Sequence, residues 1–332
     1  QTPTITLEEK VINKVNEIML SAGLNEIQTS SLIGKPLLDK FKITYDDENA
    51  VKVLNAASED YAMLRQTLAA SVLNCMKYNF DNGQKNFWAY EIGKTYIKTA
   101  PADEKSTGVK ETRVLEGVLT GEVQNSKWQV KTTVDFYTVK GILENLFKEL
   151  DVLRRIKIVP IEKTDLINTH KALHPYRTAV IMLLGKRPLP IGYFGQVHPT
   201  LIDKLKLNQN AFLFKVDLTE LIGAVKESVP RFKHIPQYPE VRRDIAFIIN
   251  DEVSFDDIQK VIKSSVKQNI FKGSEIFDVY QGEHVEDGFK SVAFRIKMQD
   301  ENATLTDEII EQQMTSVREK LQKTYAQISF RE

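Results

Sequence analysis

Five residues in the last third of the chain have the types and spacing to hold an unstacked nucleotide base. Asp278 and Tyr280 lie two positions apart in a segment that alternates like a β-strand, so their side chains share one face. The same alternation of side chains, referred to below as parity, places Ala246, Ser291 and Arg331, from three other predicted strands, on that face. An aromatic ring can stack on a base, while carboxylate, hydroxyl and guanidinium groups can hydrogen-bond to its edge, and a hydroxyl or guanidinium group can also donate to a phosphate. The pattern indicates a base-binding slot.

The same residues also fit a purely structural interpretation. Tyr280 would then be a half-exposed sheet aromatic and Asp278 a solvated strand residue. This interpretation stays open because one fold can host many functions, so the fold alone does not establish base binding. Parity alone leaves both interpretations open.

The elements that carry these residues follow the order β-α-β-β-α-β. Strands are predicted at 244–250, 275–280, 289–298 and 327–331, and helices at 254–268 and from Thr306 onward. The two middle strands form a hairpin, whose turn is bounded by Gly282 and Gly288. In this ferredoxin-like arrangement both helices cover one face of the sheet and leave the other open. We expect Phe277 and Val279 on the covered face.

This segment resembles a known family. The phrases YPEVRRDIAFII, FDVYQG, GFKSVAFRI and TLTDEII are similar, in order and spacing, to the anticodon-binding domain that closes the β subunit of bacterial phenylalanyl-tRNA synthetase. The resemblance implies that the slot surrounds the first anticodon base, a guanine, with the tyrosine stacked on it. The residues implied are Ala246, Asp278, Tyr280, Ser291 and Arg331, which coincide with the face obtained from parity.

Residues 1–225 are predicted to form an α+β domain with an antiparallel sheet. Helices are predicted at 7–22, behind a capping box of Thr6 and Glu9, at 58–80, at 135–150 and after Pro199. Strands are predicted at 25–33, 84–98, 114–123, 156–160, 178–184, 191–196 and 211–216. A proline-containing linker at 226–241 then leads to the ferredoxin-like domain at 242–332.

The first domain resembles the same subunit. The phrases SEDYAMLRQTLAASVLNCMKYN, FWAYEIGKTY, HPYRTAVI and GYFGQVHPTL are similar to its class II synthetase-like core, which is catalytically silent in the family. Tyr176 stands where the family has glycine, so the role of its loop does not carry over.

Catalytic chemistry is not predicted in this chain. A class II adenylating site needs phosphate-binding arginines, but the strand around Glu91 contains none, and we expect Glu91 to lack useful partners. His170 and His174 are four residues apart without the glutamate of a zinc-protease helix, and Pro175 disrupts the helix. There is also no GxxxxGK[ST] phosphate loop. We predict no catalytic residue and no metal site.

The composition of the chain limits which partners and which cellular compartment we expect. The 332 residues are 42% hydrophobic and 27% charged, and 45 basic residues balance 45 acidic ones, so nucleic-acid binding would need a local patch. Cys75 is the single cysteine, which fits a reducing compartment. No apolar run reaches the ~20 residues of a membrane span, and the first residues lack a signal-peptide pattern. We expect a cytoplasmic protein.

The resemblance implies a non-catalytic C-terminal portion of the β subunit, lacking the family's upstream domains. Its partners would be the α subunit and tRNA specific for phenylalanine, in an enzyme of two αβ pairs. ATP and Mg²⁺ would bind mainly to the α subunit, with no cofactor in this chain. Two other functions remain open: a free-standing RNA-binding module with the topology of an RNA-recognition motif, and a purely structural assembly protein.

Overall fold

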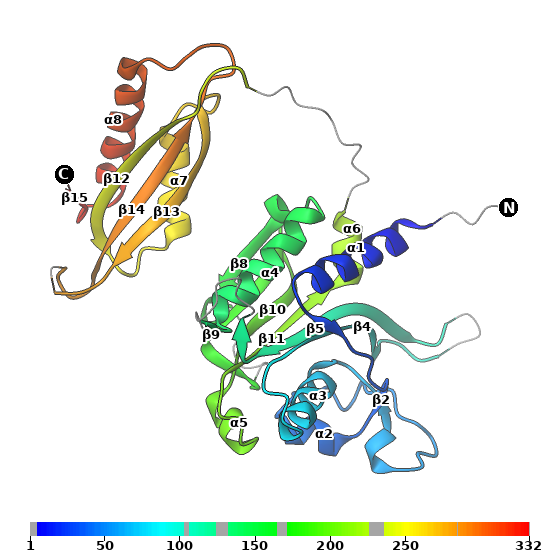
Figure 1. Ribbon diagram of the computed structural model, residues 1–332. Helices are drawn as coiled ribbons and strands as arrows, with labels where there is room; N and C mark the ends of the chain where they lie inside the picture. Colours follow the sequence, from blue (N-terminus) through cyan, green and yellow to red (C-terminus); the bar gives the residue numbers. More distant parts are fainter. Residues whose placement is uncertain are drawn as a thin grey trace. The chain divides into compact units, whose positions relative to one another are not determined.

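The chain folds into two compact units, Gln1–Ser228 and Val229–Glu332 (Figure 1). The computed structural model describes residues 5–102, 106–123, 132–164, 171–225, 236–283 and 285–331. Of the predicted linker, residues 226–235 lie outside the described residues, and Val241 is the first residue of a strand.

The first unit is built on a seven-stranded sheet. Its strands are β1 (Asn25–Glu26), β4 (Phe87–Lys98), β5 (Val109–Thr120), β11 (Ala211–Asp217), β10 (Leu189–Val197), β9 (Leu173–Leu183) and β8 (Ile156–Pro160), in this spatial order. Neighbours are antiparallel except β1 and β4, which are parallel. Two short pairs lie outside the sheet, β2 (Leu32–Ile33) with β3 (Met63–Leu64), and β6 (Glu122–Val123) with β7 (Thr132–Thr133). The predicted antiparallel sheet is confirmed except at the β1 edge.

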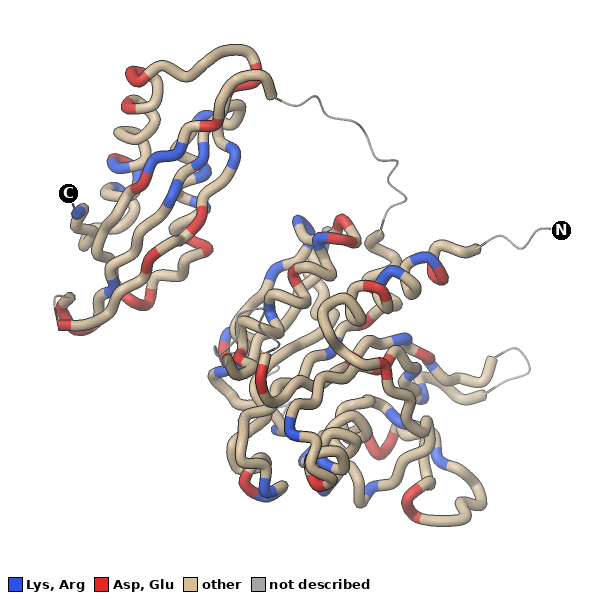
Figure 2. The backbone as a smooth tube through the Cα atoms, viewed as in Figure 1, with Lys and Arg blue, Asp and Glu red and all other residues tan. Residues whose placement is uncertain are grey.

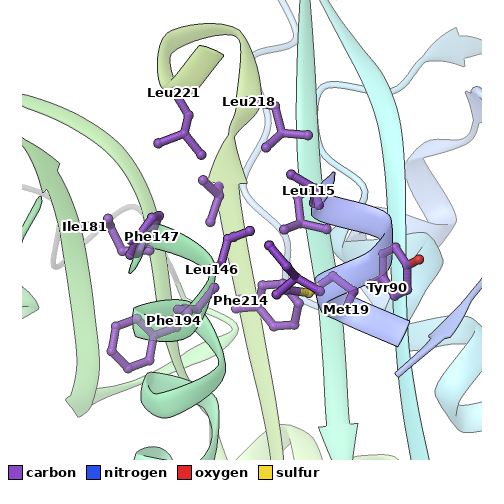
Figure 3. Packing of buried hydrophobic residues seen from close by; sticks show 14 of the residues in the cluster. Met19, Tyr90, Leu115, Leu146, Phe147, Ile181, Phe194, Phe214, Leu218 and Leu221 are labelled. Atoms are coloured by element: carbon purple, nitrogen blue, oxygen red, sulfur yellow. The ribbon is translucent and has the colours of Figure 1, made fainter. Parts of the chain in front are cut away.

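Helices cover both faces of this sheet. They are α1 (Leu7–Ser21), α2 (Lys35–Lys40), α3 (Ala69–Asp81), α4 (Phe136–Glu149), α5 (Pro199–Lys204) and α6 (Leu218–Ala224), with 3-10 turns at Glu59–Tyr61, Leu153–Arg155 and Ile161–Lys163. α1, α4 and α6 pack on one face, and α2, α3 and α5 on the other. Each face therefore has its own hydrophobic core. Figure 3 shows the core under α1, α4 and α6, where Met19 and Leu146 lie near Phe214. Because both faces are covered, Leu115 and Val118 of β5 are both buried although they point to opposite sides.

The prediction of a helix at 58–80 is wrong in its first half. Helix α3 begins at Ala69, because the preceding residues make long-range contacts that override their helical periodicity. Met63 pairs with Ile33 in a short strand, and the side chain of Arg65 is buried against β4. The backbone N–H of Leu68, just before the helix, donates to the buried carboxylate of Glu116 at 2.9 Å. The strand predicted at 25–33 is likewise divided into β1 and β2.

The second unit has the predicted ferredoxin-like fold. Its elements are β12 (Val241–Asn250), α7 (Phe255–Ser265), β13 (Phe271–Tyr280), β14 (Phe289–Met298), α8 (Asp307–Thr324) and β15 (Ser329–Arg331). The sheet order is β13-β14-β12-β15, and every neighbouring pair is antiparallel. Both helices pack on one face over a core that includes Phe247 and Phe294. The opposite face carries the predicted slot.

Candidate nucleic-acid interface

Strand pairing brings the five predicted slot residues into two adjacent rows across the open face. The first row runs Asp278, Ala293, Ala246 and Arg331, one residue from each strand. In the second row, Tyr280 pairs with Ser291, two positions along the same strands. Neighbouring strands lie about 4.8 Å apart, so the row from Asp278 to Arg331 spans about 14 Å. The predicted parity of these five residues is therefore correct.

The centre of the slot has a floor of small side chains. Ala246 and Ala293 each place only a methyl group above the sheet, whereas Arg331, at one end of the row, carries a long side chain. Nη1 of Arg331 donates to Oγ of Ser291 at 3.1 Å, which reaches across β12. Only 6% of Ser291 is exposed, so its hydroxyl lies within the face rather than on the rim. Ala293 was not among the predicted slot residues, although its parity with Ser291 was a sufficient signal.

Tyr280 lies at one side of the predicted slot, beside the turn that follows its strand. Its exposed fraction is 41%, so much of the ring is open to solvent. A Cβ atom on Gly282 would lie 2.6 Å from the Tyr280 hydroxyl oxygen and 2.8 Å from its Cζ. The ring therefore lies directly beside the Gly282 backbone, and a side chain at position 282 would displace it.

A β-bulge reverses one predicted side-chain direction. Ile276 pairs with Phe294 and Asp278 pairs with Ala293, so Phe277 is an extra residue without its own partner on β14. Ile276 consequently contacts the helix-covered core, while Phe277 is 49% exposed and lies against Arg295. The prediction that Phe277 faces the core is wrong for this reason. Val279 returns to the core-facing parity but is also about half exposed, because it lies on the edge strand.

Charged side chains next to the slot are paired across the sheet. Arg295 donates from Nε and Nη2 to the two carboxylate oxygens of Asp244, at 2.9 and 2.8 Å. These hydrogen bonds lower the pKa of the Asp244 carboxyl. Lys297 donates to Glu275 at 2.7 Å, which lowers the pKa of Glu275 in the same way. Both signs of charge therefore alternate over β12, β13 and β14, as Figure 2 shows.

Glu91 in the first unit has the partners that the sequence did not reveal. Nη1 of Arg65 donates to one carboxylate oxygen at 2.8 Å, and the Thr29 hydroxyl donates to the other at 2.6 Å. Arg65 also donates to the Lys94 carbonyl and to Thr29, so its guanidinium is engaged on several sides. The sequence argument concerned phosphate-binding arginines around Glu91, whereas the partners seen here come from other segments and are structural. Both side chains are almost fully buried, which identifies the pair as part of the packing between β4 and the segment before α3.

The histidines have local partners where they are described. Nδ1 of His174 accepts the backbone N–H of Tyr176, and Nδ1 of His198 accepts that of Thr200 at the start of α5. Tyr176 itself is largely exposed. His170 lies outside the described residues. The part of the chain that is described holds no group of three or more His, Cys, Asp or Glu side chains placed for a metal ion. Each described helix is too short or too polar to cross a membrane.

Comparison with known families covers both units. Residues 1–218 match the family described as "Phenylalanyl tRNA synthetase beta chain CLM domain". The chain belongs to the phenylalanyl-tRNA synthetase beta chain family. Residues 236–329 match "Ferredoxin-fold anticodon binding domain", which agrees with the fold of the second unit and with the resemblance found in its sequence.

Curated relatives carry the same family name. The chain is 35% identical over 314 residues to the phenylalanine–tRNA ligase beta subunit of Bacillus subtilis, covering 94% of this chain and 37% of the relative. It is 33% identical to that of Oceanobacillus iheyensis (97% and 38% covered) and 29% identical to that of Legionella pneumophila (98% and 38% covered). The chain therefore spans a little over a third of the length of these relatives.

Proposed function

We propose that this chain is the anticodon-binding and assembly portion of a phenylalanine–tRNA ligase beta subunit. The observation that carries the proposal is the open sheet face of the second unit. There a tyrosine, a carboxylate, a hydroxyl and a guanidinium surround a floor of alanines, within a domain that matches an anticodon-binding family.

Each side chain has a distinct task in the proposed slot. Tyr280 stacks on the first anticodon base, which enters above Ala246. Asp278 accepts hydrogen bonds from the Watson–Crick edge of guanine, because a carboxylate is an acceptor and that edge carries N–H donors. Ser291 and Arg331 are already linked at 3.1 Å, and Arg331 offers its remaining N–H groups to the base or to a phosphate.

The first unit is proposed to act through its surface rather than through chemistry. Glu91, on the strand that resembles a synthetase motif, is occupied by Arg65 and Thr29 in a buried network, which supports a structural role for this region. We propose that the unit docks on an alpha subunit that binds ATP and Mg²⁺, in an enzyme of two such pairs in the cytoplasm. Sedimentation of the chain with and without a candidate alpha subunit tests this docking.

The slot is tested by binding of the full chain to phenylalanine tRNA and to a copy with its first anticodon base changed. Stacking on an aromatic ring is worth about 1–3 kcal/mol, so Tyr280→Ala should weaken binding about 5- to 150-fold. Asp278→Ala should mainly reduce the preference for guanine. Tyr78→Ala is the matched control, because Tyr78 is an exposed tyrosine of α3 in the other unit. If folded Tyr280→Ala binds both tRNAs like wild type, the slot assignment is wrong.

A further inference from the structure

We propose that Phe277 and Arg295 form a second stacking position on the open sheet face, for the nucleotide next to the one held by Tyr280. This inference rests on the proposed function of the Tyr280 slot. It assigns a ligand to the one aromatic side chain that the β-bulge turns out of the core.

Phe277 and Arg295 are held next to each other by contacts within the sheet, and the pair is called the platform below. Cζ of Arg295 lies 4.8 Å from the centre of the Phe277 ring, within the range of a cation–π contact. The bidentate pair with Asp244 fixes the plane of the guanidinium. This pairing uses two of its five N–H donors and leaves the others for a phosphate or a base edge. A flat ring and a flat cation are thus held together before any ligand arrives.

The packing of β13 does not explain the position of Phe277. At the bulge, Ile276 keeps its contact with the core, so the sheet loses nothing on its covered face. The phenyl ring is instead left half exposed, which gives up about half of the burial energy of a large apolar side chain. Bulges of this type commonly redirect a side chain toward a binding site. The redirected side chain here is an aromatic ring on the face that carries the slot.

Spacing and charge both favour a neighbouring base. Phe277 and Tyr280 are three residues apart on one strand, at most about 10 Å, and the bulge shortens this distance. The charges around the platform are balanced, since Arg295 pairs with Asp244 and Lys297 pairs with Glu275. Non-specific attraction of phosphates is therefore weak here, and binding depends on stacking.

The test is a double-mutant cycle between the full chain and phenylalanine tRNA. Phe277→Ala should weaken binding about 5- to 150-fold, and Phe277→Leu should do nearly the same, because leucine keeps apolar contact but has no aromatic face. Val279→Ala is the matched control, since Val279 is about equally exposed on the same strand. Circular dichroism melts should show the same folded state for all variants.

The RNA side of the cycle uses transcripts that lack one base each: the first anticodon base, the base before it, or the base after it. We expect the effect of Phe277→Ala to disappear when one of the two flanking bases is missing, and the effect of Tyr280→Ala to disappear only when the first anticodon base is missing. Wild-type binding by Phe277→Ala would overturn the second position, and so would coupling of Phe277 to the first anticodon base or to none of the three. Coupling of Phe277 alongside a neutral Tyr280→Ala would instead overturn the Tyr280 slot.

Discussion

Removing the carboxylate of Glu91 should destabilise the first unit strongly. The Glu91 and Arg65 side chains are 3% and 4% exposed, and Glu91→Ala would leave the guanidinium buried without its counter-charge. Breaking a buried ion pair from one side costs about 3–5 kcal/mol. Arg65 would keep its hydrogen bonds to Lys94 and Thr29, which places the expected loss near the lower end of that range.

The assay is urea unfolding followed by tryptophan fluorescence. Both tryptophans of the chain, Trp88 and Trp128, belong to the first unit, so the signal does not report the second. With a urea dependence of about 3 kcal/mol per molar, the midpoint of Glu91→Ala should fall by about 1 M or more. The double variant Arg65→Met/Glu91→Leu should regain much of the loss, because it leaves no buried charge. A midpoint for Glu91→Ala equal to that of wild type would refute the structural role assigned to this pair.

Two further predictions concern the same unit. A Cβ on Gly117 would lie 2.5 Å from Phe214 and 2.6 Å from the Ala89 carbonyl oxygen, so Gly117→Ala should lower the free energy of unfolding by about 1–3 kcal/mol. Its control, Gly141→Ala on the exposed side of α4, should instead raise it by about 0.5–1 kcal/mol, as urea midpoints will show. Burial raises the pKa of Glu116, so its contribution is fully present below the unfolded pKa of about 4.3 and is lost as pH rises through the folded pKa. Urea midpoints from about pH 4 to 8 should show this fall in wild type but not in Glu116→Gln, and parallel curves would contradict it.

Elements with local signals were predicted closely from the sequence. Helix α4 was expected at 135–150 and spans Phe136–Glu149, because the capping box of Asp135 and Thr138 and the apolar stripe lie within the helix itself. The order of elements in the second unit was predictable for the same reason. The parity of Tyr280 with Ser291 followed from the alternation of their strands.

Features set by distant partners were not predictable in this way. Arg65 pairs with Glu91, which lies 26 positions away in the sequence, and no local sequence pattern indicates that pairing. The bulge at Phe277 interrupts a run that alternates regularly in the sequence, and it is visible only from the pairing with β14. The shared face of the five predicted residues could therefore be predicted from the sequence, while the second aromatic on that face could not.

The contact between Tyr280 and Gly282 has a kinetic consequence. A ring that already rests against the turn has little rotational freedom left to lose when a base stacks on it. Rotamer changes of a partly exposed side chain take picoseconds to nanoseconds, so they do not limit the association rate of the RNA, and the position of the ring should act on the dissociation rate. Gly282→Ala, which would push the ring away, should therefore speed dissociation in stopped-flow measurements more than it slows association.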